Sequence, residues 1–260
     1  RTTRAATALR HAAQRLEELT AQAGVSATGT LDDIIRLADE WERGLALTQM
    51  PPGVGISWDR IPPDALDAIV QRTTQRIGAL SMPIPEEQAE ALNQVLIRGV
   101  AIGENPREAA RELLNRLGGN FDGGRMRAET IMRTEILDAL RWAALASRLR
   151  NKDVLNGWVW HCDLSERTCP ACLAMNGTWF PLDQPGPEGH PNCRCVAVPQ
   201  TKTWRELGFD VDEPADVTRD ARDWFDNLPQ EARVKIMGRE RLRRLDAGEL
   251  RWEDIPRRVE

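Results

Sequence analysis

The chain has 260 residues and a formal net charge of −5. This length is enough to bury a core in one large domain or two smaller ones. The acidic balance argues against a protein that coats nucleic acid, although it leaves room for a local basic face. No run approaches the roughly 18 to 20 apolar residues of a membrane span, and the start does not resemble a signal peptide, so we expect cytoplasmic folding. Because the sequence begins with Arg1 rather than Met, we expect a fragment, a processed chain or the ordered part of a longer one.

The first half of the chain predicts helices only. Apolar residues recur at helical spacing, and capping or proline signals open several of these stretches. The expected helices cover residues 2–23, 31–41, 62–80, 85–102 and 106–117. A loop is expected at residues 50–55, where prolines and glycines interrupt regular structure.

The second half opens with a long helix predicted over residues 125–150 and then changes to a period of two. Trp158, Trp160 and Cys162 fall on one face of the expected strand. A second strand is predicted at 178–180, after the turn Asn176-Gly177, with residues 194–198 as its partner. Short helices follow at 220–228, 230–237 and 239–244.

These elements predict an α+β fold that is mainly α, with a helical N-terminal body, a small zinc-stabilised β-element and short C-terminal helices. We divide it into residues 1–122, 123–200 and 201–260. The first part is a helical region, the second carries the long helix and the β-element, and the third is a helical tail.

Four of the five cysteines and one of the three histidines gather in one short segment. Cys169 and Cys172 form a CxxC pair, and His190 follows about twenty residues later in the sequence His-Pro-Asn-Cys-Arg-Cys. Two ligand pairs on tight turns, separated by a hairpin-sized insert, are typical of a structural Zn²⁺ site. In a reducing cytoplasm, thiolates held by a metal are also more plausible than disulfides.

Two residues compete for the fourth ligand position. His190 and Cys193 share the turn Pro191-Asn192, whose spacing lets both side chains point at one ion, and this favours Cys193. Cys195 stands two residues later on an expected strand and leaves the same face, so it can substitute. The predicted ligands are therefore Cys169, Cys172, His190 and either Cys193 or Cys195.

Other residues near the site suggest alternative roles. Carboxylates close in sequence, such as Asp163 and Glu166, would suit a catalytic zinc, but a thiolate-rich site makes metal-bound water a poorer acid. His161 is expected to be a surface residue, and Trp158, Trp160 and Trp179 are expected to form the core of the β-element. The arginine-rich stretch 239–244 is interleaved with acidic residues and predicts a solvated helix face.

The order of several motifs resembles the phage Mu F-like minor head protein family. It comprises Arg133-Thr134-Glu135 on the long helix, Trp158, the segment 167–172, Asn176-Gly177 and the segment 190–195. The resemblance covers about residues 125–199. It implies a structural protein of a tailed bacteriophage head, associated with the portal and facing the capsid interior, that serves head assembly or DNA packaging and ejection. It also implies that the helical residues 1–122 form the region that docks on the portal or capsid.

The resemblance also implies partners and a location. The expected partners are the portal protein, the major capsid protein and packaged DNA, and the expected location is the virion. Some relatives carry fused toxin domains, and we find none in these residues, so we expect no enzyme. Two rival hypotheses are a zinc-dependent nuclease or other hydrolase acting on DNA, which needs an open metal position, and a zinc module that reads DNA, which needs a basic recognition helix.

Overall fold

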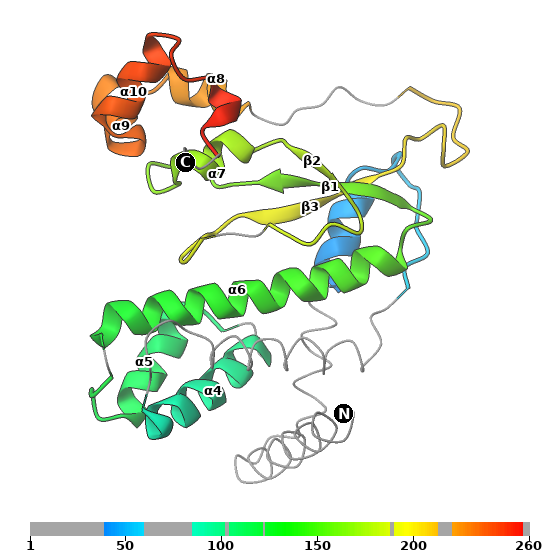
Figure 1. The fold of residues 1–260 in the computed structure, drawn as a ribbon. Coiled ribbons are helices and arrows are strands. Elements are labelled where there is room, and N and C mark those ends of the chain that lie inside the picture. Colours follow the sequence, from blue (N-terminus) through cyan, green and yellow to red (C-terminus); the bar gives the residue numbers. More distant parts are fainter. Residues whose placement is uncertain are drawn as a thin grey trace, which may run out of the picture. The chain divides into compact units, whose positions relative to one another are not determined.

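The computed structural model describes residues 39–59, 85–101, 104–121, 123–187, 190–212 and 220–256. Helices dominate this part of the chain, and one small antiparallel sheet accompanies them (Figure 1). The predicted α+β, mainly α fold is confirmed. The helices predicted over 2–23 and 62–80, and most of the one over 31–41, lie outside the described residues.

The chain forms two compact units that are not consecutive in sequence. One comprises residues 1–39 and 60–143, and the other comprises 40–59 and 144–260. The long helix α6, Gly124–Arg150, belongs to the first unit up to Ala143 and to the second from Ala144. The predicted division at 122 and 200 into three functional parts stays a prediction.

In the described part of the first unit, α4 (Glu86–Ala101) and α5 (Pro106–Arg116) accompany α6. All three helices were predicted. The side chain of Asn105 caps α5 by accepting a hydrogen bond of 3.0 Å from the Arg107 backbone N–H. Gly99 lets α4 approach α6, because a Cβ built there would lie 3.1 Å from Cδ1 of Ile136.

The sheet of the second unit has the order β2-β1-β3, and both pairings are antiparallel. The strands are β1 (Leu155–His161), β2 (Trp179–Pro181) and β3 (Val196–Thr201). The prediction that residues 194–198 pair with 178–180 was wrong, since β3 pairs with β1. The three-residue β2 ends in Pro181, which has no N–H to donate, and it pairs only with residues 157–159 of β1, whereas β3 pairs with β1 between Leu155 and His161.

Residues 40–59 complete the outer edge of β3. The side-chain amide of Gln49 donates to the Pro199 carbonyl over 2.8 Å and accepts from the Thr201 N–H over 3.2 Å, as a neighbouring strand would. The indole N–H of Trp204 donates to the Gln49 carbonyl over 2.7 Å. This segment therefore covers a sheet edge that would otherwise expose unpaired backbone groups.

A buried ion pair joins the same segment to the end of α6. The guanidinium of Arg148 lies 3.2 Å from a carboxylate oxygen of Glu42, and the two side chains are 0% and 1% exposed. Arg148 also lies over the ring of Trp158, at 5.7 Å from its centroid. Burial lowers the pKa of Arg148, and the Glu42 carboxylate opposes that shift.

Three predicted helices close the chain: α8 (Ala221–Asp226), α9 (Gln230–Met237) and α10 (Arg239–Asp246), followed by the short 3-10 helix η1 (Trp252–Asp254). Arginine stacking ties them together. Arg222 lies 5.2 Å from the ring centroid of Trp252, and Arg233 lies 5.3 Å from that of Phe225.

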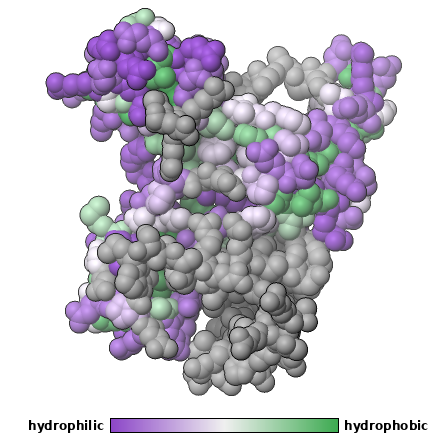
Figure 2. Space-filling model, viewed as in Figure 1, coloured by the Kyte–Doolittle hydropathy of each residue, from purple (hydrophilic) through white to green (hydrophobic). Residues whose placement is uncertain are grey.

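The outer surface of these helices is strongly hydrophilic (Figure 2). In α10, Arg239, Arg241 and Arg243 are exposed, and Arg243 lies 2.9 Å from a carboxylate oxygen of Glu240. The arginine-rich stretch is thus a solvated helix face, as predicted. Within the described residues, we find no helix that is both long and apolar enough to cross a membrane.

Candidate metal centre

Cys169 and Cys172 lie at the start of the short helix α7 (Pro170–Met175). Cys169 is the N-cap residue, and its sulfur accepts a hydrogen bond of 3.3 Å from the Cys172 backbone N–H. Pro170 follows in the first turn, where a missing N–H costs nothing. The CxxC spacing therefore folds into one helical turn that places both sulfurs on the same side.

The Cys169 sulfur is prepared to carry negative charge. Its hydrogen bond with the Cys172 side chain, together with the Cys172 backbone N–H, outweighs burial and lowers the pKa of Cys169 to about 5. The same hydrogen bond with Cys169, further ones with Cys193 and Cys195, and burial raise the pKa of Cys172. The protein environment thus favours the thiolate form of Cys169 and the thiol form of Cys172.

The second part of the site is a tight turn from His190 to Cys193. The Cys193 N–H donates to the His190 carbonyl over 3.0 Å, and Asn192 adopts a left-handed φ of 66°. Asn tolerates this conformation better than most residues. Nε2 of His190 and the Cys193 sulfur both lie beside the Cys172 sulfur, at 3.5 Å and 3.9 Å.

The orientation of the His190 ring follows from one hydrogen bond. Nδ1 lies 2.7 Å from the Pro191 carbonyl oxygen, which can only accept, so Nδ1 carries the proton. In the neutral ring, the lone pair is then on Nε2, which lies 3.5 Å from the Cys172 sulfur. Burial alone would lower the pKa of His190, but the Pro191 carbonyl and the sulfurs of Cys169 and Cys193 raise it.

Among the described residues, two groups of donors are close enough to hold a metal ion. Cys169, Cys172 and His190 form one group, and Cys172, Cys193 and Cys195 form the other. Within each group, the ligand atoms all lie within 4.8 Å of one another. The fold thus brings together all five residues that the sequence singled out, and the assignment of ligands within the set stays a prediction.

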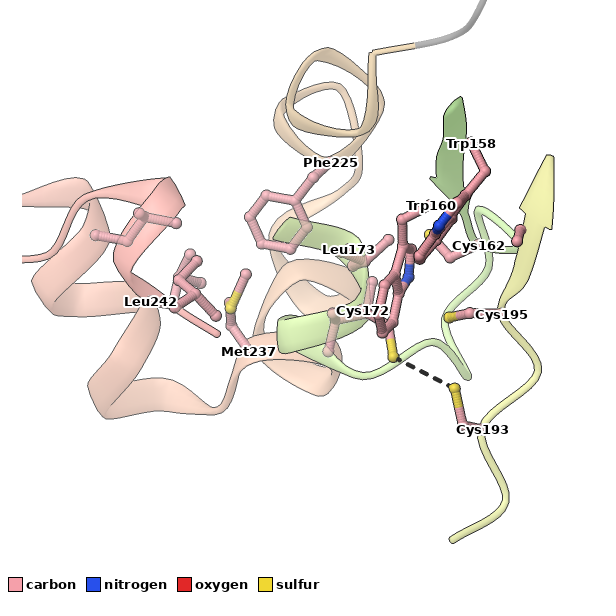
Figure 3. Packing of buried hydrophobic residues seen from close by; sticks show 14 residues of the cluster. Trp158, Trp160, Cys162, Cys172, Leu173, Cys193, Cys195, Phe225, Met237 and Leu242 are labelled. Atoms are coloured by element: carbon pink, nitrogen blue, oxygen red, sulfur yellow. Dashed lines mark hydrogen bonds between the residues drawn. The ribbon is translucent and has the colours of Figure 1, made fainter. Parts of the chain in front are cut away.

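Cys193 and Cys195 belong to the hydrophobic core, and each is 2% exposed. The Cys193 sulfur lies 3.9 Å from that of Cys172 (Figure 3). A hydrogen bond with Cys172 lowers the pKa of Cys195. A hydrogen bond with Cys193, burial and charge repulsion from Cys193 outweigh it and raise that pKa to about 12. A bound cation would be needed to keep these sulfurs together as thiolates.

Residues on either side of the site met their predictions in part. His161 is exposed on β1, as expected of a surface residue. Trp158 and Trp160 are buried, but Trp179 is 52% exposed, so its prediction as a core residue was wrong. Trp179 lies on the edge strand β2, where one side of the strand has no sheet neighbour. Cys162 is buried outside both donor groups, and burial raises its pKa to about 12.

The donors share one apolar cluster with the C-terminal helices. α7 contacts both α8 and η1. Figure 3 shows Leu173 of α7 between the tryptophans of β1 and Phe225 of α8, and Met237 and Leu242 extend the same cluster. Sequence reasoning missed this connection, since nothing in the spacing of the cysteines indicates which helix covers them.

Comparison with known proteins gives one family. The sequence model described as Phage Mu protein F like protein matches residues 90–198. Residues 90–198 are thus similar to the phage Mu protein F-like family. The predicted resemblance is confirmed, and the matched range extends further towards the N-terminus than the motifs did.

The Mu F-like match indicates a protein related to the phage head. The matched residues include most of α4, all of α5 and α6, all five donors of the metal centre and the first half of β3. They leave out residues 40–59 and the C-terminal helices, which pack in the same unit as the donors. No curated protein and no solved structure gives a significant match.

Proposed function

We propose that this chain is a structural minor head protein of a tailed bacteriophage, located inside the head at the portal vertex. In this proposal it assists head assembly or DNA packaging and ejection, with the portal protein as its main partner and the major capsid protein and packaged DNA as further contacts. The observation that carries the proposal is the Mu F-like match over residues 90–198.

We propose further that Zn²⁺ is the metal of the centre and that its role is structural. With bonds of about 2.3 Å to sulfur and about 2.0 Å to nitrogen, tetrahedral zinc holds two sulfurs about 3.8 Å apart, and a sulfur and a nitrogen about 3.5 Å apart. The Cys172 sulfur lies 3.9 Å from that of Cys193 and 3.5 Å from Nε2 of His190. These distances support a site already shaped for zinc.

The donor set also supports a closed site rather than a catalytic one. A catalytic zinc keeps one position for water, with three protein ligands. Here four donors lie around the shared sulfur of Cys172, and three of them are thiols. We therefore propose that the metal acts through folding, by joining α7 to the turn before β3, and that the chain is not an enzyme.

The head location is tested on particles. Purified virions, DNA-free heads and the soluble fraction of infected cells would be compared by quantitative mass spectrometry, and the chain would be located in a reconstruction without imposed symmetry. The expected result is a low copy number in both kinds of particle, with density next to the portal. Absence from particles, with the chain in the soluble fraction, would contradict the proposal.

The proposed lack of catalysis is tested with the metal-loaded chain on single-stranded and double-stranded DNA. We expect no cleavage with or without added zinc. Cleavage that disappears on chelation and returns with zinc would instead support the nuclease hypothesis.

A further inference from the structure

The metal centre contains more donors than one tetrahedral ion needs. Zinc in a structural site takes four ligands, whereas the two donor groups together hold five side chains. The two donor groups overlap in Cys172 alone. Cys172 is therefore the common neighbour of two pairs, Cys169 with His190 and Cys193 with Cys195.

The arrangement of the backbone explains the extra donor. Cys169 and Cys172 are fixed by the first turn of α7, and His190 is fixed by its bond to Pro191. Cys193 ends the tight turn, and Cys195 directly precedes β3. Both of these cysteines are buried, so each can meet an ion beside Cys172 without first leaving solvent.

No single set of four donors stands out from the geometry. Cys172 has both His190 at 3.5 Å and Cys193 at 3.9 Å as close neighbours. Cys193 and Cys195 lie within 4.8 Å of each other as well as of Cys172. A set of four donors that includes Cys172 therefore combines one complete group with one donor of the other group.

We propose that the centre binds one zinc ion through Cys172 and any three of the other four donors, so that one donor is always in reserve. This inference rests on the proposed zinc site. Its consequence is that loss of any one donor except Cys172 leaves a complete tetrahedral set. The metal centre then keeps its zinc after loss of a single thiol, whereas a site with only four ligands would lose one of its ligands without replacement.

Zinc stoichiometry in single variants tests the reserve donor. Cys169→Ser, His190→Ala, Cys193→Ser and Cys195→Ser would be analysed by native mass spectrometry after dialysis against a weak chelator. We expect each to retain one zinc per chain, because four donors remain in every case. Cys172→Ser and the double variant C193S/C195S should each retain less than about a tenth of an equivalent, since the first loses the shared ligand and the second keeps only three donors. Cys162→Ser is the matched control and should behave like the unaltered chain.

Three other results would overturn the inference: zinc loss in any of the four single variants, zinc retention in Cys172→Ser, or two equivalents in the unaltered chain. If a buried cysteine variant fails to fold, His190→Ala and Cys169→Ser still decide, because His190 is exposed and Cys169 is only half-buried. An unaltered chain without zinc would instead contradict the proposed zinc site itself.

Discussion

Arg148 and Glu42 illustrate how one pair of side chains can support a whole unit. Both side chains are almost completely buried and come from segments far apart in sequence. Removal of one partner from a buried ion pair leaves the other charge without compensation in a medium of low polarity. The importance of the pair for stability therefore lies in the free energy lost when one partner is removed, and not only in the strength of the ionic attraction.

For the variant Glu42→Gln, we expect a loss of about 3 to 5 kcal/mol in the free energy of unfolding, the usual cost of leaving a buried charge unpaired. Urea denaturation followed by tryptophan fluorescence would measure it. Glu166→Gln is the control, because Glu166 lies 2.7 Å from Lys235 in an exposed pair, and its stability should match the unaltered chain. Equal effects from the two variants would contradict this account.

At the residue scale, the sequence singled out the cysteines and the histidine that the fold gathers, but it gave no sign of the buried ion pair. The donors occupy two tight local turns, so spacing along the chain translates directly into spacing in space. Glu42 and Arg148 are brought together only by the tertiary fold. Each taken alone is an ordinary charged residue on a helix, with no local signal of burial.

At the element scale, β2 depends on a glycine in its neighbour. A Cβ built on Gly157 of β1 would lie 2.3 Å from Nε1 of Trp179 and 2.6 Å from the Phe180 backbone oxygen. The indole of Trp179 thus lies across Gly157, although more than half of its side chain is exposed. Only a residue without a side chain permits this close approach.

We expect Gly157→Ala to displace β2 and to destabilise the second unit by about 1 to 3 kcal/mol, the usual cost of overpacking. Thermal unfolding and the fluorescence of Trp179 would report it. Gly44→Ala is the matched control, because a Cβ at Gly44 meets nothing within 4 Å. An unchanged melting temperature for Gly157→Ala would show that Trp179 does not rest on this position.

The cover of the β3 edge gives a second prediction at this scale. Gln49→Leu removes the side-chain amide hydrogen bonds to β3 and leaves the Pro199 carbonyl and the Thr201 N–H without that partner. We expect a loss of about 1 to 3 kcal/mol in the free energy of unfolding. Thr48→Ala is the control, since its exposed hydroxyl bonds only to the nearby Leu45 carbonyl. A Gln49→Leu variant as stable as the control would contradict the role of this segment as an edge cover.

Element types were easier to predict than element partners. Helices α4, α5, α6, α8, α9 and α10 were expected from periodicity and capping, which are local properties. The pairing of β3 with β1 was not expected. The order of strands depends on which strand takes the central position of the sheet, and local sequence does not indicate this. Gln49 acts across the sheet edge from 150 residues away, a relation that no local pattern contains.

At the scale of the whole molecule, the chain builds its two units from interleaved segments. Residues 40–59 join the unit that holds the metal centre, although they precede the Mu F-like match by many residues. Composition and periodicity do not predict that segments of the two units alternate along the sequence. A version of the chain cut at the limits of the family match would therefore lack both the edge cover of β3 and the C-terminal helices.

The metal centre and the C-terminal helices share one core, so we expect the metal to stabilise both. Chelation should release the constraint on α7, and Leu173 would then no longer be held against Phe225 and its neighbours. The first unit contains none of the five donors, and its helices should be insensitive to the metal.

Amide hydrogen exchange with and without a zinc chelator tests this central claim most directly. The account predicts that chelation increases exchange in α7, β3 and helices α8 to α10, while α4 and α5 keep their protection, and that added zinc restores the original pattern. Exchange that is unchanged by chelation, or that rises equally in α4 and α5, would contradict a structural role of the metal in this phage head-related protein.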